Sequence, residues 1–194
     1  MRRQPAVRFG LLMAALAASA GCTNFHEVDP GRLYRSAQLS GPQLEQVINA
    51  HNIRTVINLR GRNDHKPWYR TQRQVTRRLG VEQIDIPMSA RTLPSRRNVL
   101  KLLEAFDRAP RPMLIHCRGG ADRTGEAVAL YRIDQMKQTR DRALQALTPW
   151  TLHFEMFYPA KRRFIRMYRG RQWLKEHYDP TRSPPGHQPV GSMN

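Results

Sequence analysis

The residues with the clearest chemical potential are residues 116–124, which read His-Cys-Arg-Gly-Gly-Ala-Asp-Arg-Thr. Five residues separate Cys117 from Arg123, and two of the five are glycines. A cysteine attacks phosphorus only as the thiolate, which cationic neighbours and a helix N-terminus favour. The planar guanidinium of Arg123 can donate two parallel hydrogen bonds to a phosphate. The spacing therefore predicts a loop that binds a phosphate group and attacks it with sulfur.

The flanking sequence predicts a strand before this loop and a helix after it. The short apolar run Met113–Ile115 leads into Cys117, and a helical pattern is expected over 125–136. Backbone N–H groups in such a loop, together with the helix dipole, bind anions. Glycines let the backbone approach the ligand closely. We therefore expect the phosphate-binding residues to be Arg118, Gly119, Gly120, Ala121, Asp122, Arg123 and Thr124.

The loop, extended by one glycine, resembles the signature loop of the protein tyrosine phosphatase superfamily, in its dual-specificity branch. Residues 33–38 and 55–60 are similar to the first strands of small bacterial and fungal dual-specificity phosphatases, so that the resemblance covers about residues 32–137. It implies that Cys117 is the nucleophile, Arg123 the phosphate clamp and Thr124 the hydroxyl partner of the sulfur. The implied activity is hydrolysis of a phosphomonoester through a cysteinyl-phosphate, without metal or organic cofactor. The substrate would be a phosphorylated protein, a phosphoinositide or an inositol phosphate.

The proton donor for the leaving oxygen is harder to place. In the related bacterial enzymes this acid is an Asp a few residues after an Ile-Pro pair, whereas residues 88–94 here contain no carboxylate. Asp122 lies inside the loop, as in myotubularin-like lipid phosphatases. Asp85 lies near the end of a predicted strand, 32 residues before Cys117. Because a general acid must reach the leaving group, we favour the nearer Asp122. Asp85, or a leaving group that needs no acid, are the alternatives.

Two other functions stay open. A rhodanese-like sulfurtransferase also places a Cys in a strand–helix loop, but that loop is usually one residue shorter, and the Arg123-Thr124 ending argues against it. A non-catalytic lipoprotein could bind phosphate or anionic lipid through the same loop without turnover.

The N-terminal residues predict a targeting segment over residues 1–21. Three arginines within the first eight residues precede the apolar run 11–20, which is too short to span a membrane. Ala18-Ser19-Ala20 fits an ordinary signal peptidase site, whereas Ser19-Ala20-Gly21-Cys22 resembles a lipobox. On the second interpretation Cys22 is lipidated. We then expect an exported, periplasmic protein anchored at the outer membrane.

Charge and cysteine content restrict the partners. The net charge is +18, and without residues 1–21 there are 30 basic and 15 acidic residues, a net charge of +15. Such an excess attracts polyanions. Because no aromatic-rich nucleic-acid motif is present, we expect the partners to be anionic lipids or phosphorylated substrates and not nucleic acid. We also expect a monomer. A disulfide between the two cysteines, Cys22 and Cys117, would disable the nucleophile, and the scattered histidines lack metal-ligand spacing. We expect neither a disulfide nor a metal site.

Other basic residues are given two different interpretations. Arg60, Arg62 and Arg91 could extend the phosphate pocket. The group Lys161, Arg162, Arg163, Arg166 and Arg169 is interpreted as a solvent-exposed helix face.

Strands alternating with helices predict a single α/β domain with a mainly parallel sheet flanked by helices, which the resemblance identifies as the cysteine-phosphatase fold. The expected domain spans residues 32–178, after a linker at 22–31 and before a disordered tail at 179–194. Strands are expected at 55–59, 81–86 and 113–115, and helices at 42–51, 68–79, 95–106, 125–136, 141–147 and 159–177. Such sheets bind ligands beyond the carboxyl ends of their strands, where Cys117 lies.

Overall fold

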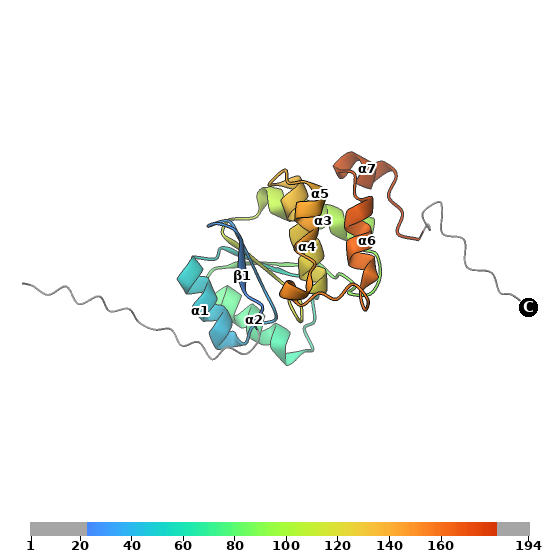
Figure 1. The fold of residues 1–194 in the computed structure, drawn as a ribbon. Helices are drawn as coiled ribbons and strands as arrows, with labels where there is room; N and C mark the ends of the chain where they lie inside the picture. Colours follow the sequence, from blue (N-terminus) through green and yellow to red (C-terminus); the bar gives the residue numbers. More distant parts are fainter. Residues whose placement is uncertain (1–22, 182–194) are drawn as a thin grey trace, which may run out of the picture.

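The computed structural model describes residues 23–181, which form one α/β domain around a five-stranded sheet (Figure 1). This confirms the predicted fold class. The strand order is β1-β2-β5-β3-β4. The strands are β1 (His26–Asp29), β2 (Leu33–Ser36), β3 (Thr55–Asn58), β4 (Glu82–Asp85) and β5 (Met113–His116).

The pairing of the strands fixes where the loop after β5 emerges. All neighbours run parallel except β1, which is antiparallel to β2. In register, His116 at the end of β5 pairs with Ser36 of β2 and with Asn58 of β3, and Asn58 pairs with Asp85 of β4. The carboxyl ends of four strands therefore lie level at one edge of the sheet, with Cys117 following the central strand.

Helices cover both faces of the sheet (Figure 1). They are α1 (Gly41–His51), α2 (Pro67–Arg78), α3 (Arg96–Arg108), α4 (Asp122–Asp134), α5 (Arg140–Leu144), α6 (Pro159–Met167) and α7 (Arg171–Glu176), with a 3-10 helix η1 (Pro149–Thr151). Side chains of α1 and α2 share a core with Val56 and Leu114 on one face, and α3 to α7 enclose the larger core on the other. Ser95 is the N-cap of α3, since its side chain accepts a hydrogen bond from the Asn98 backbone.

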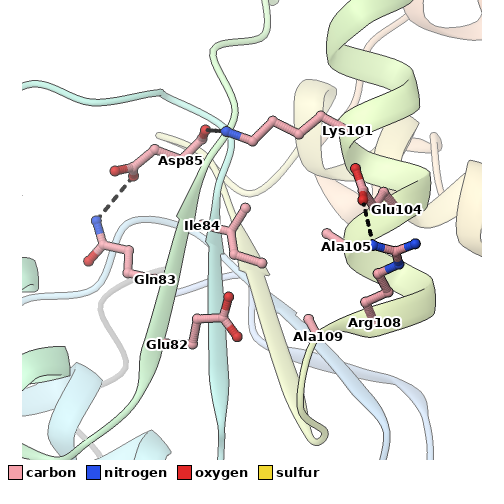
Figure 2. Close-up of a pocket in the computed structure, with 9 residues that line it drawn as sticks. All are labelled: Glu82, Gln83, Ile84, Asp85, Lys101, Glu104, Ala105, Arg108 and Ala109. Carbon is pink, nitrogen blue, oxygen red and sulfur yellow. Dashed lines mark hydrogen bonds and ion pairs between the residues drawn. The ribbon is translucent and has the colours of Figure 1, made fainter.

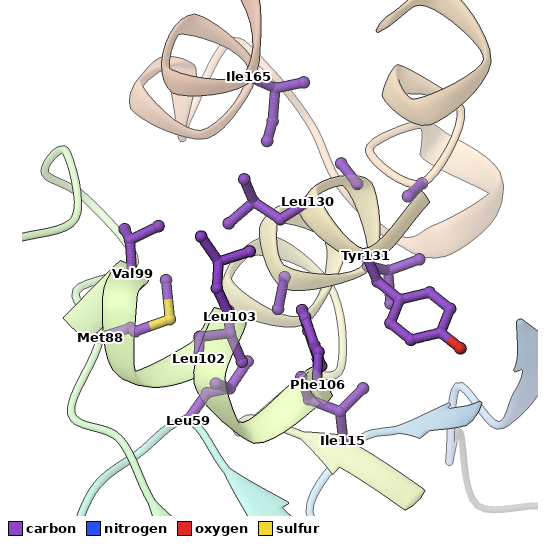
Figure 3. Packing of buried hydrophobic residues seen from close by; sticks show 14 of the residues in the cluster. Leu59, Met88, Val99, Leu102, Leu103, Phe106, Ile115, Leu130, Tyr131 and Ile165 are labelled. Atoms are coloured by element: carbon purple, nitrogen blue, oxygen red, sulfur yellow. The ribbon is translucent and has the colours of Figure 1, made fainter. Parts of the chain in front are cut away.

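The larger core surrounds α4, the helix that follows the loop 117–121 (Figure 3). Every residue from Thr124 to Tyr131 is buried, so the helix is covered on all sides. Phe106 of α3 and Tyr131 of α4 meet edge-to-face with ring centroids 5.1 Å apart. Because a helix buried all round cannot shift without opening the core, α4 is a rigid base for the loop at its N-terminus.

Four expectations about element boundaries are corrected. The expected linker 22–31 contains β1, an edge strand whose Asp29 accepts a hydrogen bond from Tyr131 at 2.6 Å, so the domain begins before residue 32. Helix α4 begins at Asp122 rather than at residue 125, because the Gly125 N–H donates to Ala121 and closes the first turn. The expected helix over 159–177 is divided in two, because α6 ends at Met167 and α7 starts after Gly170, its N-cap, which has a φ of 101°. The expected helix over 141–147 is the shorter α5.

The targeting segment 1–21, Cys22 and residues 182–194 of the expected tail lie outside the described residues. At the other end, the buried Tyr178 donates to the Pro94 carbonyl at 2.7 Å. Between residues 23 and 181, no helix has the length and apolar character needed to cross a bilayer.

Candidate active site

The loop from Cys117 to Ala121 connects β5 to α4 and lies against the end of β2. The Cys117 side chain carries a free thiol and is buried. The loop turns at Gly120, whose φ is +67°. A Cβ atom at Gly120 would lie 2.6 Å from the Ala37 nitrogen and 2.7 Å from the Ser36 carbonyl. Only glycine fits at this position, because both the space and the backbone conformation exclude a side chain.

Three consecutive carbonyl oxygens of the loop are held from outside. The Arg118 carbonyl accepts from the Gln38 backbone at 3.1 Å, and the Gly119 carbonyl accepts from the Asn24 amide at 3.2 Å. The Gly120 carbonyl accepts from Arg35 at 2.6 Å. In a trans peptide the N–H points opposite to the C=O of the same peptide plane. The next three N–H groups, those of residues 119–121, therefore point toward the inside of the loop, as an anion cradle requires.

Arg35, on β2, is the buried cation beneath this loop. Its guanidinium donates from Nη2 to the Gly120 carbonyl at 2.6 Å and from Nη1 to the Ala146 carbonyl at 3.0 Å. Burial lowers the pKa of Arg35 to about 10, and the nearby Cys117 partly opposes this shift. Arg35 thus remains charged near neutral pH and lies within electrostatic range of the thiol. Arg35 belongs to the segment 33–38 on which the resemblance rests, but no pattern in the sequence indicates this role.

Arg123 and Thr124 lie in the first turn of α4, two and three residues after the loop's last residue, Ala121. Arg123 Nε and Thr124 Oγ1 are buried and have no hydrogen-bond partner within residues 23–181. Buried polar atoms are normally satisfied, so groups of this kind are candidates for ligand contact. The structure therefore brings the predicted clamp and hydroxyl to the helix N-terminus that faces the cradle.

His116, directly before the cysteine, is neutral. Its ring is completely buried, which lowers its pKa to about 4. Nδ1 lies 3.3 Å from the Cys117 carbonyl oxygen, a contact that fixes the backbone at the start of the loop. A neutral ring supplies no positive charge to the thiol, so its contribution is the contact with the backbone.

Asp122 begins α4, and its carboxylate is held by a histidine that the sequence analysis missed. His153 Nδ1 lies 2.8 Å from Asp122 Oδ1, and the His153 side chain is fully buried, whereas that of Asp122 is 18% exposed. His153 lies in the segment between η1 and α6, 31 residues away along the chain, so no local sequence pattern relates the two.

Asp85, the alternative acid, ends β4 and is engaged by several donors. Its carboxylate accepts from Asn58 at 2.8 Å, from Tyr69 at 2.5 Å and from Gln83 at 3.1 Å. Burial, and then this hydrogen bond, raise the pKa of Tyr69 to about 12. Figure 2 shows Asp85 beside Gln83 and Lys101 in a pocket of about 500 Å³ between β4 and α3, which includes no residue of the catalytic loop. The structure thus gives Asp85 an extensive structural role.

The segment 88–94, where related enzymes carry the acid, is attached to α4 through Lys161. Lys161 Nζ donates to the Thr92 carbonyl at 2.8 Å and to Glu126 at 3.0 Å. Both charged side chains are completely buried, so the interpretation of Lys161 as part of an exposed helix face is wrong. Lys161 lies on the inner side of α6, where only this ion pair compensates its charge. Burial raises the pKa of Glu126 to about 7, although Lys161 opposes this.

Of the three basic residues expected to extend the pocket, Arg60 lies nearest the loop. Its guanidinium stacks over the Trp68 ring at 3.6 Å and donates to Gln38 at 3.2 Å. Burial lowers the pKa of Arg60, and the charges of Arg123 and Arg118 lower it further. Arg62 instead pairs with Asp64 in solvent.

The fold is similar to those of several solved phosphatases. P. aeruginosa TpbA is 24% identical with a TM-score of 0.61, over 76% of this chain and 86% of that one. The catalytic core of the PP-IP phosphatase SIW14 from S. cerevisiae is 20% identical with a TM-score of 0.63, over 75% and 85%. A putative phosphatase from Shewanella putrefaciens is 22% identical with a TM-score of 0.59, over 75% and 91%. These likenesses establish the fold. No curated protein matches the sequence.

A family model provides the assignment that the structural likenesses leave open. The model is described as "DSP-PTPase phosphatase fused to NAD+ Kinase", and it matches residues 18–159. The match covers most of the domain and includes Cys117, Asp122, Arg123 and His153. The chain therefore belongs to this family of dual-specificity-type, cysteine-based phosphatases.

Proposed function

We propose that the protein hydrolyses phosphomonoesters by a two-step mechanism in which Cys117 is the nucleophile. The observation that carries this proposal is the orientation of the loop: three carbonyl oxygens are fixed outward, so that the N–H groups of residues 119–121 point inward at the start of α4. Such an arrangement binds a dianionic phosphate beside the sulfur.

In the first step the Cys117 thiolate attacks phosphorus opposite the leaving oxygen. The S–P bond forms while the P–O bond breaks, and the leaving oxygen takes a proton from a general acid. Negative charge spreads over three equatorial oxygens, which the loop N–H groups and the Arg123 guanidinium stabilise. The charge of Arg35, fixed beneath the loop, favours the bound phosphate.

Asp122 is the general acid that the geometry supports best. It lies in the same helical turn as Arg123, and its bond with His153 engages Oδ1, which leaves Oδ2 to carry the proton. Three donors already surround the carboxylate of Asp85. In the second step, water attacks the cysteinyl-phosphate, Asp122 accepts its proton, and the Thr124 hydroxyl can donate to the departing sulfur.

The substrate class we propose is a phosphorylated protein, a phosphoinositide or an inositol phosphate. One of the similar structures is TpbA in complex with pTyr, and another is described as a PP-IP phosphatase. Arg60 and the exposed Arg118 add positive charge near the loop, which suits substrates with more than one anionic group.

The test is hydrolysis of an aryl phosphate by the reduced protein in the presence of EDTA. Phosphate release that is lost in Cys117→Ser supports the proposal, whereas activity that survives this substitution contradicts it. Vanadate binding without turnover of any phosphoester would indicate the non-catalytic binding function. Cyanide-dependent consumption of thiosulfate would indicate a sulfurtransferase.

The acid is tested by comparing leaving groups. We expect Asp122→Asn to slow hydrolysis of an alkyl phosphate by about 10²–10⁴-fold and that of p-nitrophenyl phosphate far less, because nitrophenolate leaves without a proton. Asp85→Asn is the matched variant, and its losses should be equal for both substrates. The opposite pattern would identify Asp85 as the acid.

We also propose that the protein is exported and held at a membrane through a lipid on Cys22. The support is the order of arginines, apolar run and Ser19-Ala20-Gly21-Cys22 in the sequence. Fractionation of bacteria that express the full chain tests this, since the wild type should stay with the membrane in a high-salt wash and Cys22→Ala should be released by it.

A further inference from the structure

The segment 149–157, between α5 and α6, exposes a cluster of large apolar side chains. Trp150 is 90% exposed and Met156 is 83% exposed, followed by Phe157 at 66%, Phe154 at 49% and Leu152 at 42%. These five are all the large exposed hydrophobic residues among residues 23–181. Single exposed apolar residues are common on proteins, but a contiguous group marks an interaction surface.

The backbone of this segment is ordered, so the exposure is built into the fold. The Thr151 hydroxyl donates to the Ala146 carbonyl at 3.0 Å, and the His153 N–H donates to the Thr148 carbonyl at 3.0 Å. A second turn is closed by the Phe157 N–H, which donates to the Phe154 carbonyl at 3.0 Å. The side chains therefore project from two fixed turns rather than from a loose loop.

The apolar cluster lies directly beside the catalytic loop. The Asn24 amide donates both to the Gly119 carbonyl at 3.2 Å and to the Thr151 carbonyl at 3.1 Å. His153 of the same segment contacts Asp122 at 2.8 Å. In Figure 1 the segment runs, in orange, past the end at which α4 begins. A surface that contacts the cluster would thus face the entrance to the site.

Exposed basic residues lie on two segments near the cluster, one bridged to it by Asn24 and the other bonded to the start of α6. The exposed Arg118 precedes Gly119, and the exposed Arg91 precedes Thr92, whose carbonyl accepts from Lys161 at the start of α6. The single acidic residue of the segment, Glu155, is neutralised by Arg162 at 2.7 Å and by Arg166 at 2.6 Å. The partner of this surface should therefore combine apolar and anionic groups.

The chain also enters the domain at this place. Thr23 accepts from the Ala37 backbone at 2.6 Å, and the adjacent Asn24 bonds to Thr151 of the cluster. The first described residues, Thr23 and Asn24, therefore lie beside the segment that carries the exposed aromatic residues.

We propose that the segment 149–157 docks on an anionic phospholipid bilayer. The aromatic side chains and Met156 insert at the boundary between headgroups and acyl chains, and Arg118 and Arg91 face the anionic headgroups. We favour a bilayer over a protein partner because Trp150 and Met156 are 90% and 83% exposed near basic residues, and exposed Trp together with Lys or Arg is typical of surfaces that bind the membrane interface. The catalytic loop is then held facing the membrane surface. This goes beyond the proposed hydrolysis and does not depend on which phosphomonoester is cleaved.

The first experiment measures the fluorescence of Trp150 in the full chain with phosphatidylcholine vesicles, with or without phosphatidylglycerol. We expect a blue shift and quenching by brominated lipid with the anionic vesicles. Both signals should be lost in Trp150→Phe, which keeps Trp68 and Trp173 as the background. Signals that are absent in the wild type, or that persist in Trp150→Phe, overturn the proposal.

The second experiment measures vesicle sedimentation of Trp150→Ser/Met156→Ser. Because two large apolar side chains are removed, partitioning should fall about tenfold or more. Residues 1–22 are identical in both proteins, so their contribution cancels in the comparison. Hydrolysis of a soluble aryl phosphate should be unchanged, which separates docking from catalysis. Equal partitioning of the double variant and the wild type, or loss of soluble hydrolysis in the double variant, contradicts a docking role.

A charge-matched pair tests the electrostatic half of the proposal. Arg91→Gln should weaken binding to phosphatidylglycerol vesicles. Arg77→Gln removes the same charge from an exposed position of α2, on the other face of the sheet, and should not weaken binding. Equal effects of the two substitutions would mean that binding follows the net charge alone, which contradicts an oriented docking surface.

Discussion

Replacement of Arg35 by methionine should destabilise the domain and disable the catalytic loop together. The substitution keeps an unbranched side chain of similar length in the buried position but removes both donors. The Gly120 and Ala146 carbonyls, now bonded at 2.6 and 3.0 Å, would be left without these partners. Hydrogen bonds to a charged group contribute about 1.5–3 kcal/mol each, so the expected loss of unfolding free energy for the two is about 3–6 kcal/mol.

The loss of activity follows from the orientation of the loop. Once the Gly120 carbonyl is released, the N–H of Ala121 is no longer held inward, and misplacement of a catalytic group by about 1 Å can reduce the rate about 10²-fold. Arg35 acts here as a positioning residue. Arg35→Lys keeps the charge, but one ammonium cannot reproduce the guanidinium fork, so part of the activity should return.

Urea denaturation and kcat/KM for an aryl phosphate are the two assays, with Arg32→Met as the matched control. Arg32 lies one strand position before β2, and its half-exposed side chain pairs with Asp29 at 3.4 Å and hydrogen-bonds to Tyr131, so its loss should change stability by about 1 kcal/mol or less. If Arg35→Met were as stable and as active as Arg32→Met, our interpretation of the loop would be refuted.

Three further predictions concern the surroundings of the site. Gly120→Ala should lower the unfolding free energy by at least about 2 kcal/mol and abolish hydrolysis, because the new Cβ would lie 2.6 Å from the Ala37 backbone nitrogen. Gly119→Ala is the control: its Cβ would have no neighbour within 4 Å, so the same denaturation assay should show a loss of less than about 1 kcal/mol. Lys161→Met should lower the unfolding free energy by about 3–5 kcal/mol, because it leaves Glu126 buried without its counter-charge. The double variant Glu126→Leu/Lys161→Met should recover most of this loss. Equal stabilities of the single and double variants would contradict the reasoning. The pKa of His116 is about 4 in the folded state and 6.5 in the unfolded state, so the unfolded state binds the proton first as pH falls. The contribution of neutral His116 to the unfolding free energy, up to about 3 kcal/mol, is therefore lost as pH falls from about 6.5 to about 4. The pKa of Glu126 is raised from 4.5 to about 7, which makes the unfolding free energy change with pH in the opposite direction. The measurement is therefore the difference between the pH dependence of the unfolding free energy of wild type and that of His116→Asn. Identical pH dependence would disprove the low pKa assigned to His116.

Features carried by neighbouring residues were predictable from sequence. The spacing of Cys117 and Arg123, the run of apolar residues before them and the N-cap at Ser95 depend on interactions within a few positions, and the structure shows the expected strand, loop and helix. The alternation of strands and helices was sufficient for the fold class, because parallel strands need helical crossovers.

Features set by distant contacts were missed. β1 has a single apolar residue because it lies at an edge of the sheet, so its sequence resembles a linker. Lys161 looks like a surface residue until Glu126, 35 positions away, is placed against it. Arg35 and His153 likewise gain their roles only when β2 and the segment after η1 come to lie beside the loop.

Mass spectrometry of the protein quenched in acid during turnover of an aryl phosphate tests the central claim most directly. The proposed mechanism predicts one phosphate group per chain on the peptide that contains Cys117, and neither phosphorylated peptide nor turnover in Cys117→Ser. Phosphate attached to another residue, or steady hydrolysis by Cys117→Ser, would contradict it.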